Sequence, residues 1–255
     1  MLTDAHTHLY RYEGKELEDV MARARESGVE VIIAVGQTVG ISRQALKVAS
    51  QFAPVYAAVG IHPWMADQAT RESLSTIESL AGEPKVVAIS EIGLDYLKPG
   101  IPAKEVQIEV FRAQIALAKQ LSLPIIIHDK GAHKDTVRCL QEEGASQVGG
   151  VVHGFSGDYQ MARECLEMGF LISARELVNV PAERGLDGVF RRLPLDGIAI
   201  ETDSPVPFPM NREKGIKTEP AHGKVIVEKV AQLKGVSAQE VSRITTESLK
   251  KLLKL

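Results

Sequence analysis

Imidazole and carboxylate residues at the ends of short apolar runs are the feature of this sequence that most directly indicates chemistry. These groups are common ligands of divalent transition-metal ions. Side chains at the C-terminal ends of successive strands meet at one place in an α/β barrel. The pattern therefore predicts a metal site together with the fold that assembles it. All seven histidines fall at positions that such a site would use: His6, His8, His62, His128, His133, His153 and His222.

The first strand-like run carries two of these histidines in the pattern H-x-H. Asp4, His6 and His8 alternate along this run, so their side chains point to one face. Two imidazoles at that spacing can bind one cation. An isolated H-x-H is explained equally well by two surface histidines, and the remaining candidates favour the metal.

Glu91 ends the apolar run 86–91. A carboxylate at the end of a buried strand is costly unless it is paired or bound to a cation. Its two oxygens would allow it to bridge two metals. The alternative is a buried glutamate that is paired with a basic residue.

His128 and His153 each end a nearly continuous apolar run. Two imidazoles from adjacent strands would complete a second metal position. The alternative for either residue alone is a hydrogen-bonded core histidine.

Glu201 and Asp203 alternate at the end of the last strand-like run. Asp203 lies nearer the strand end, so we expect it to be a metal ligand and the general base. Glu201 would lie deeper and would orient a metal-binding histidine. A structural ion pair is the alternative.

Several residues near these strand ends are predicted to contact the substrate. A protonated His62, in G-I-H-P-W, would donate a hydrogen bond to a phosphate oxygen. Trp64 could stack on a base or a sugar, and the alternative for it is that it only caps the barrel. Basic residues follow the fifth strand-like run and line the long segment 203–218; those we expect to bind substrate are Lys130, His133 and His222, with Lys134, Arg212, Lys214 and Lys217 nearby. A solvated loop surface is the alternative for each of them.

Apolar runs and helical periodicity alternate along the whole chain. Eight strand-like runs separated by helices predict a parallel sheet, and eight in this length favour a closed (β/α)₈ TIM barrel with the metal site at the C-terminal ends of its strands. We expect residues 1–255 to form a single domain. The expected strands are 2–6, 30–36, 55–61, 86–91, 124–128, 149–153, 169–174 and 197–202, and the expected helices are 15–27, 40–51, 70–81, 103–122, 134–143, 159–167, 182–192, 219–234 and 237–252.

Composition limits the classes of partner. A net charge of -3 excludes a bulk electrostatic binder of nucleic acid, although it allows a nucleic acid held at a local site. The two cysteines, Cys139 and Cys165, have no metal-ligand spacing and indicate a reducing cytoplasm. No run of 18 apolar residues predicts a membrane span. We expect a cytoplasmic monomer.

These motifs, taken in chain order, resemble the TatD-like metal-dependent hydrolases, which are amidohydrolase-type TIM barrels. The resemblance runs almost end to end and rests on D-A-H-T-H-L (4–9), G-I-H-P (60–63), E-I-G-L-D-Y (91–96), L-P-I-I-I-H (123–128), V-H-G-F-S-G (152–157), E-T-D-S-P (201–205) and E-P-A-H (219–222).

The resemblance implies two divalent metal ions per chain. His6, His8 and Asp203 would hold one ion, His128 and His153 the other, and Glu91 would bridge them. His62 and Glu201 match further site positions of the family. TatD-like proteins are chiefly deoxyribonucleases, including 3′-to-5′ exonucleases on single strands, and some members remove D-amino acids from tRNA.

Four positions depart from the family pattern. The family usually has Cys, Arg and two Asn residues where this chain has Gly154, Lys130, Thr218 and Ser248. Lys130 keeps the charge of arginine but loses bidentate phosphate binding. None of these departures removes an expected ligand, so they bear on the substrate more than on the metal.

The sequence thus predicts a metal-dependent hydrolase, with a single-strand deoxyribonuclease as the leading hypothesis. Nitrogen and oxygen ligands without thiolate suit Zn²⁺, Mn²⁺ or Fe²⁺, and Mg²⁺ is possible. The enzyme alternative is hydrolysis of an ester or amide, such as a D-aminoacyl-tRNA. The alternative without catalysis is a metal-stabilised binding scaffold.

Overall fold

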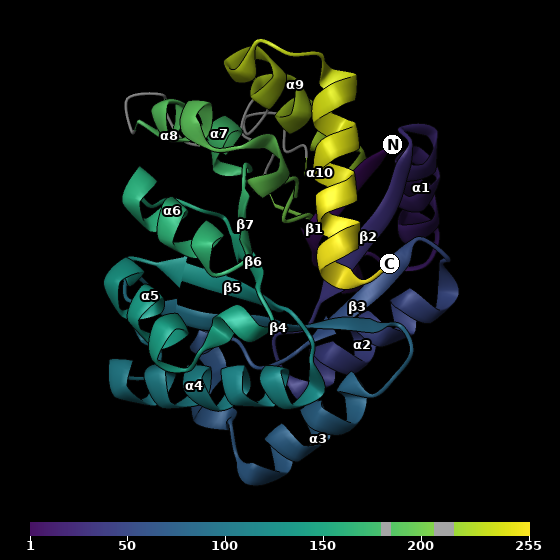
Figure 1. Cartoon of the computed structure of the whole chain (residues 1–255). Helices are drawn as coiled ribbons and strands as arrows, with labels where there is room; N and C mark the ends of the chain where they lie inside the picture. The colour runs from purple at the N-terminus through teal and green to yellow at the C-terminus, as the bar shows by residue number, and fades with distance from the viewer. Residues whose placement is uncertain (180–184, 207–216) are drawn as a thin grey trace.

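The eight expected strands form one parallel sheet whose order follows the chain from β1 to β8. The computed structural model describes residues 1–179, 185–206 and 217–255 (Figure 1). The strands are β1 (Leu2–Thr7), β2 (Val29–Val35), β3 (Val55–Val59), β4 (Val86–Asp95), β5 (Ile125–Lys130), β6 (Gly150–His153), β7 (Phe170–Ser173) and β8 (Ile198–Ala199).

Backbone hydrogen bonds between the last and first strands close the sheet. The N–H of Ala5 donates to the carbonyl of Ile200 at 2.9 Å, and the N–H of Asp203 donates to the carbonyl of His6 at 3.0 Å. A parallel bridge joins Thr7 to Ser204. The closed (β/α)₈ barrel that the alternating pattern predicts is confirmed.

Helices surround the barrel. The α-helices are α1 (Gly14–Glu26), α2 (Val39–Gln51), α3 (Arg71–Ala81), α4 (Lys104–Leu121), α5 (His133–Glu142), α6 (Tyr159–Glu167), α7 (Glu176–Asn179), α8 (Leu186–Arg192), α9 (Gly223–Lys234) and α10 (Ala238–Leu253). Short 3₁₀ turns are η1 (Leu9–Arg11), η2 (Pro63–Gln68), η3 (Ala145–Gln147), η5 (Leu195–Gly197) and η7 (Pro220–His222). No helix among the described residues is long and apolar enough to cross a membrane.

Several expected elements differ from the structure. The helix expected at 182–192 begins at Leu186 as α8, and residues 180–184 lie outside the described chain. The helix expected at 219–234 begins with the turn η7, after which α9 starts at Gly223. β8 is only two residues long, and Asp203 adopts a φ of 55°, a left-handed conformation that ends extended structure.

β4 is longer than expected, so the prediction that Glu91 ends its strand is wrong. Its pairing with β3 stops at Ile89, and its register against β5 shifts between Ile89 and Ile92 before it continues to Asp95. The second half of β4 therefore pairs with β5 alone. As a result Glu91 lies inside the strand, and Asp95 takes the position at its end.

The apolar core has two layers. One lies between the strands and the surrounding helices. The other fills the barrel itself with small and branched side chains such as Ala5, Ile33 and Ile126, and includes Leu249 and Leu253 of α10. α10 also contacts β1, β8 and the turn η5 that precedes β8, so it covers the N-terminal ends of the strands. The opposite end is left for the polar residues.

Candidate metal centre

The polar residues at the C-terminal ends of the strands gather around one cavity of about 260 Å³. Its lining includes six of the residues that the sequence singles out: His8, His62, Glu91, His128, His153 and Asp203. His6 lies beneath them and is fully buried. Three groups of these side chains have ligand atoms that all lie within 4.8 Å of one another, namely His6–His8–Asp203, His6–His153–Glu201 and His62–Glu91–His128.

The first group contains the three residues expected to hold one cation. Nε2 of His8 lies 3.0 Å from Oδ1 of Asp203, and Nε2 of His6 lies 3.7 Å from the same oxygen. Two ligand atoms bound at about 2.1 Å to one tetrahedral cation lie roughly 3.3 Å apart. The three donors are therefore spaced as ligands of one ion would be.

His6 gives the clearest evidence that a cation fits this site. Neither of its ring nitrogens has a hydrogen-bond partner among the described residues, although the side chain is 0% exposed. A buried polar atom without a hydrogen bond costs free energy, and a bound cation would offset that cost. Nitrogen and carboxylate donors without sulfur are the donor set of Zn²⁺, Mn²⁺ and Fe²⁺ sites. The residues present fit a divalent cation.

Carboxylates also control the protonation of His6. Burial alone lowers the pKa of this imidazole, but the charges of Glu91, Glu201 and Asp203 raise it to about 9. The metal-free ring therefore carries a proton near neutral pH. A cation must displace that proton because only the neutral imidazole is a ligand.

Glu91 lies at the centre of the cluster. Oε1 lies 2.7 Å from Nδ1 of His128, 3.3 Å from Nε2 of His62 and 3.9 Å from Nε2 of His153. Oε2 faces Nε2 of His6 at 3.5 Å. Burial raises the pKa of Glu91, but the surrounding imidazoles hold it well below its usual value. Oε2 also accepts a hydrogen bond from Nε2 of Gln37 at 3.2 Å, and the two oxygens of Glu91 face different histidines.

Glu201 contacts His153. Its Oε1 lies 2.8 Å from Nδ1 of His153, and it accepts hydrogen bonds from Oγ of Ser173 at 2.6 Å and from the N–H of Gly154 at 2.8 Å. Burial raises the pKa of Glu201, but the charge of His153 and these donors lower it to about 2. This geometry leaves Nε2 of His153 directed at the cluster, as the orienting role expected of Glu201 requires.

His62, which the sequence analysis assigns to the substrate, lies among the candidate metal ligands, because it forms one of the three groups together with Glu91 and His128. Its Nδ1 accepts a hydrogen bond from the backbone N–H of Trp64 at 3.1 Å, which places the ring proton on Nε2. Burial lowers the pKa of His62 to about 4. The protonated form considered from the sequence is therefore disfavoured near pH 7, and a neutral Nε2–H is the available donor.

The other expected substrate contacts divide between two places. Lys130 lines the metal cavity and donates from Nζ to the carbonyl of Gly154 at 2.9 Å. His133 lies outside the cavity, where its Nδ1 is 2.6 Å from Oδ2 of Asp129. His222 is also outside the cavity, and its Nδ1 accepts from the N–H of Glu219 at 3.1 Å. Arg212 and Lys214 lie outside the described residues.

Asp95 is a site residue that the sequence analysis missed. Its Oδ2 lies 3.2 Å from Nε2 of His128 and accepts a hydrogen bond from Nε1 of Trp64 at 2.7 Å. The signal was present, because Asp95 follows Glu91 by four residues and alternating strand positions face the same side. The expected end of the strand at Glu91 hid it.

Arg175 is the second missed residue, and no sequence pattern pointed to it. Nη2 lies 3.1 Å from Oδ2 of Asp203, and Nη1 contacts Glu176. Burial raises the pKa of Asp203, but the hydrogen bond with His8 and the charges of His153 and Arg175 hold it below its usual value. Asp203 thus presents Oδ1 to the histidines and Oδ2 to a guanidinium.

The fold and this cluster define the protein as a (β/α)₈ barrel with the donor set of a metal-dependent hydrolase. A sequence model described as "TatD related DNase" matches residues 3–254. The chain therefore belongs to the TatD-related DNase family.

Individual relatives agree with this assignment. The chain is 41% identical to the uncharacterized metal-dependent hydrolase YabD of Bacillus subtilis, and the match covers 100% of both chains. It is 30% identical to human deoxyribonuclease TATDN3 over 98% of this chain and 94% of the relative. The crystal structure of YJJV, a TatD homolog from Escherichia coli, superposes with a TM-score of 0.90 at 27% identity over 100% of this chain and 98% of that chain.

Proposed function

We propose that this protein is a divalent-metal-dependent phosphodiesterase that shortens single-stranded DNA from its 3′ end. The observation that carries the proposal is the buried cluster around Glu91, with His6 at its base, whose ring nitrogens make no hydrogen bond with the described residues. The description of the matched family and the name of the human relative support DNA as the substrate. The reducing cytoplasm is the compartment that we propose, supported by two buried free cysteines, Cys139 and Cys165.

The proposed metal ligands follow from the placement of the donors. His6, His8 and Asp203 would hold one cation, and His128 and His153 would hold a second. Glu91 would bridge them because its two oxygens face different histidines. When bound, such ions acidify a water molecule and offset negative charge on the phosphate. Zn²⁺, Mn²⁺ and Fe²⁺ suit the donor set, and Mg²⁺ remains a candidate.

The protein side chains supply proton transfer and orientation. Asp203 is ionised near neutral pH, because its pKa is lowered, and can accept the proton of the attacking water at a carboxylate oxygen. Nε2–H of His62 and the ammonium of Lys130 face the same cavity and would hold phosphate oxygens. Glu201 keeps the ring of His153 oriented through Nδ1.

The experiment that tests this proposal is cleavage of a 5′-labelled single-stranded oligonucleotide by protein loaded with Mn²⁺, Zn²⁺ or Mg²⁺. We expect a ladder that shortens from the 3′ end and disappears on chelation and in Asp203→Asn. Asp196→Asn is the matched control, because Asp196 is exposed on the turn η5 that precedes β8, at the other end of the barrel.

Two other results would redirect the assignment. A metal-loaded protein that leaves DNA intact but hydrolyses D-aminoacyl-tRNA or simple esters would be an ester hydrolase. A protein that is stabilised by metal but turns over none of these substrates would be a scaffold, and Glu91→Ala would then change only its stability.

A further inference from the structure

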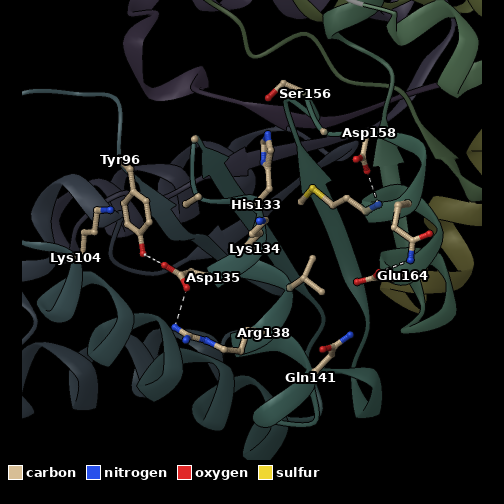
Figure 2. A pocket seen from close by; sticks show the side chains of 16 residues that line it. Tyr96, Lys104, His133, Lys134, Asp135, Arg138, Gln141, Ser156, Asp158 and Glu164 are labelled. Atoms are coloured by element: carbon tan, nitrogen blue, oxygen red, sulfur yellow. Dashed lines mark hydrogen bonds and ion pairs between the residues drawn. The ribbon is translucent and has the colours of Figure 1, made fainter.

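A second, larger cavity lies beside the metal centre. We call it the α5–α6 groove. It has a volume of about 960 Å³ and is lined by Tyr96, Lys104, residues 131–135 with Val137, Arg138 and Gln141 of α5, and residues 156–158 with Gln160, Met161 and Glu164 of α6 (Figure 2). None of the proposed metal ligands belongs to this lining. A ligand of the groove would therefore be distinct from the cations.

The linings of the groove and the metal cavity meet at two points of the chain. Asp95 lines the cavity and the next residue, Tyr96, lines the groove; Lys130 lines the cavity and Gly131 lines the groove. Consecutive Cα atoms are about 3.8 Å apart, so the two spaces adjoin along both of these loops.

The ridge between the two spaces carries an exposed apolar side chain. Leu97 is 72% exposed, and its methyl groups lie over Gly131, where an added Cβ would come within 2.7 Å of Cδ2. The indole of Trp64 lies on the cavity side of the ridge, with the ammonium of Lys98 at 3.6 Å from its ring centre. An apolar side chain and aromatic rings beside a phosphodiesterase centre are the surfaces on which unpaired bases stack.

Each carboxylate of the groove lining contacts a neighbouring donor. Asp135 accepts from the hydroxyl of Tyr96 at 2.9 Å and pairs with Arg138 at 2.8 Å, and Asp158 caps α6 through the N–H of Met161 at 2.8 Å. Glu164 accepts from Gln160 at 2.5 Å.

Two lysines of the groove have no carboxylate partner among the residues that the structure describes. Within the described residues Lys134 has no ion pair, and Lys104 contacts only the ring of Tyr96, at 4.2 Å. Nδ1 of His133 faces the carboxylate of Asp129. This contact raises the pKa of His133, although burial lowers it. Figure 2 shows His133 and Lys134 in the middle of the groove between the side of Tyr96 and the side of Asp158.

We propose that the α5–α6 groove binds the nucleotides that adjoin the one being removed, so that the enzyme acts on a single strand several nucleotides long. This inference rests on the proposed phosphodiesterase activity. Lys104, His133 and Lys134 contact backbone phosphates, and Leu97 with Tyr96 contacts bases. The metal cavity, at about 260 Å³, is at the lower limit of ligand pockets, roughly 300–1,000 Å³, so the rest of the strand must be held outside it.

The variant that tests the groove is Lys134→Glu. Lys134 is exposed in the first turn of α5, where a negative charge is favourable to the helix, so the substitution should leave folding intact. Lys251→Glu is the matched control, because Lys251 is exposed on α10 and faces away from both cavities.

Two substrates separate the groove from the chemistry. We expect kcat/KM of the wild type to rise with the length of an oligothymidylate up to about four nucleotides, whereas thymidine 5′-(p-nitrophenyl phosphate) reports the metal cavity alone. Lys134→Glu should lower kcat/KM for the long oligonucleotide at least tenfold more than for the small ester and flatten the length dependence. An equal fall in kcat/KM on both substrates, or no fall, would overturn the proposal that the groove binds the strand.

A binding measurement keeps the two proposals distinguishable. Fluorescence anisotropy measures how tightly metal-loaded Asp203→Asn binds a labelled oligothymidylate at several salt concentrations. Adding Lys134→Glu to this variant should reduce the slope of log affinity against log salt concentration by about 0.7, the value of one lost phosphate contact on a single strand. If Lys134→Glu leaves the salt dependence of binding unchanged, strand binding in the groove is refuted, whatever the activity. If the wild type cleaves no oligonucleotide but Lys134→Glu still changes the salt dependence, the proposed phosphodiesterase activity is refuted and strand binding in the groove is not. A parallel oligouridylate titration identifies RNA as the preferred strand if it binds more tightly.

Discussion

The two ends of the barrel are built from the same eight strands and have opposite chemistry. At the N-terminal end the interior is apolar and is closed by Leu249 and Leu253 of α10. At the C-terminal end the interior holds imidazoles and carboxylates that are equally buried, with His6 and Glu201 at 0% exposure. Burial stabilises the first set and is costly for the second unless a cation or an ion pair compensates. The comparison indicates that one end maintains the fold and the other carries the function.

The largest expected effect is at the centre of the polar end. Glu91→Gln removes the charge that faces four histidines, so we expect turnover of the oligonucleotide to fall by about 10³-fold or more. The thermal midpoint of the metal-free protein should fall, because the buried, protonated ring of His6 loses the carboxylate that compensates its charge. Steady-state kinetics measure the turnover, and a thermal melt measures the midpoint of unfolding. Glu247→Gln, an exposed glutamate of α10, is the control; a comparable loss of activity there would break the comparison.

The apolar end should show the reverse behaviour. Leu249→Ala removes a side chain that is 1% exposed beneath the barrel, so we expect the free energy of unfolding to fall by about 3 kcal/mol. Turnover per folded molecule should stay within twofold, since Leu249 lies at the far end from the cavity. Urea unfolding and active-site titration measure these quantities. Leu255→Ala, at 43% exposure, should change neither. A fall in turnover that matches the fall in stability would show that the two ends are coupled.

Metal binding should depend on pH through His6. The carboxylates around it raise its pKa to about 9, so the cation must displace a proton from this ring at any lower pH. The apparent affinity for Mn²⁺ should therefore increase about tenfold for each pH unit between pH 6.5 and 8, and decrease as pH falls. Calorimetric titration in two buffers of different ionisation enthalpy measures the protons released. If His6→Asn keeps the full slope, another group is the source of the proton.

The smallest expected effect is at Arg175, on the border of the site. Arg175→Gln removes the guanidinium beside Asp203, so the pKa of Asp203 should rise and kcat/KM should fall by roughly tenfold. The acid limb of the pH–rate profile should move toward neutral pH. Arg175→Lys should recover part of the loss because it keeps the charge. A profile identical to the wild type would mean that Arg175 only packs against the site.

Local patterns predicted most of the fold. Apolar runs bounded by polar segments place all eight strands within a few residues, because burial on both faces of a parallel strand demands continuous apolar sequence. The candidate metal donors could be predicted for a related reason: a buried apolar strand seldom ends in histidine unless that residue has a role. The length of β4 was not visible, because its second half depends on pairing with β5 alone.

The candidate site was only partly predictable. Asp95 had a sequence signal that a wrong strand end concealed. Arg175 had none, since its ion pair with Asp203 joins residues that follow the neighbouring strands β7 and β8 and are far apart in the chain. His133 and Lys130 looked equivalent in sequence, yet one lines the groove and the other the metal cavity.

The sequence alone determined the barrel, the family and the set of side chains that can bind metal, because periodicity and residue type are local properties. The tertiary structure decided which of these side chains meet. It placed the two oxygens of Glu91 between different histidines, aimed Glu201 at His153 and opened a groove beside the cavity. Such distances arise from strand register and loop packing between residues far apart in the chain, and no local pattern encodes them.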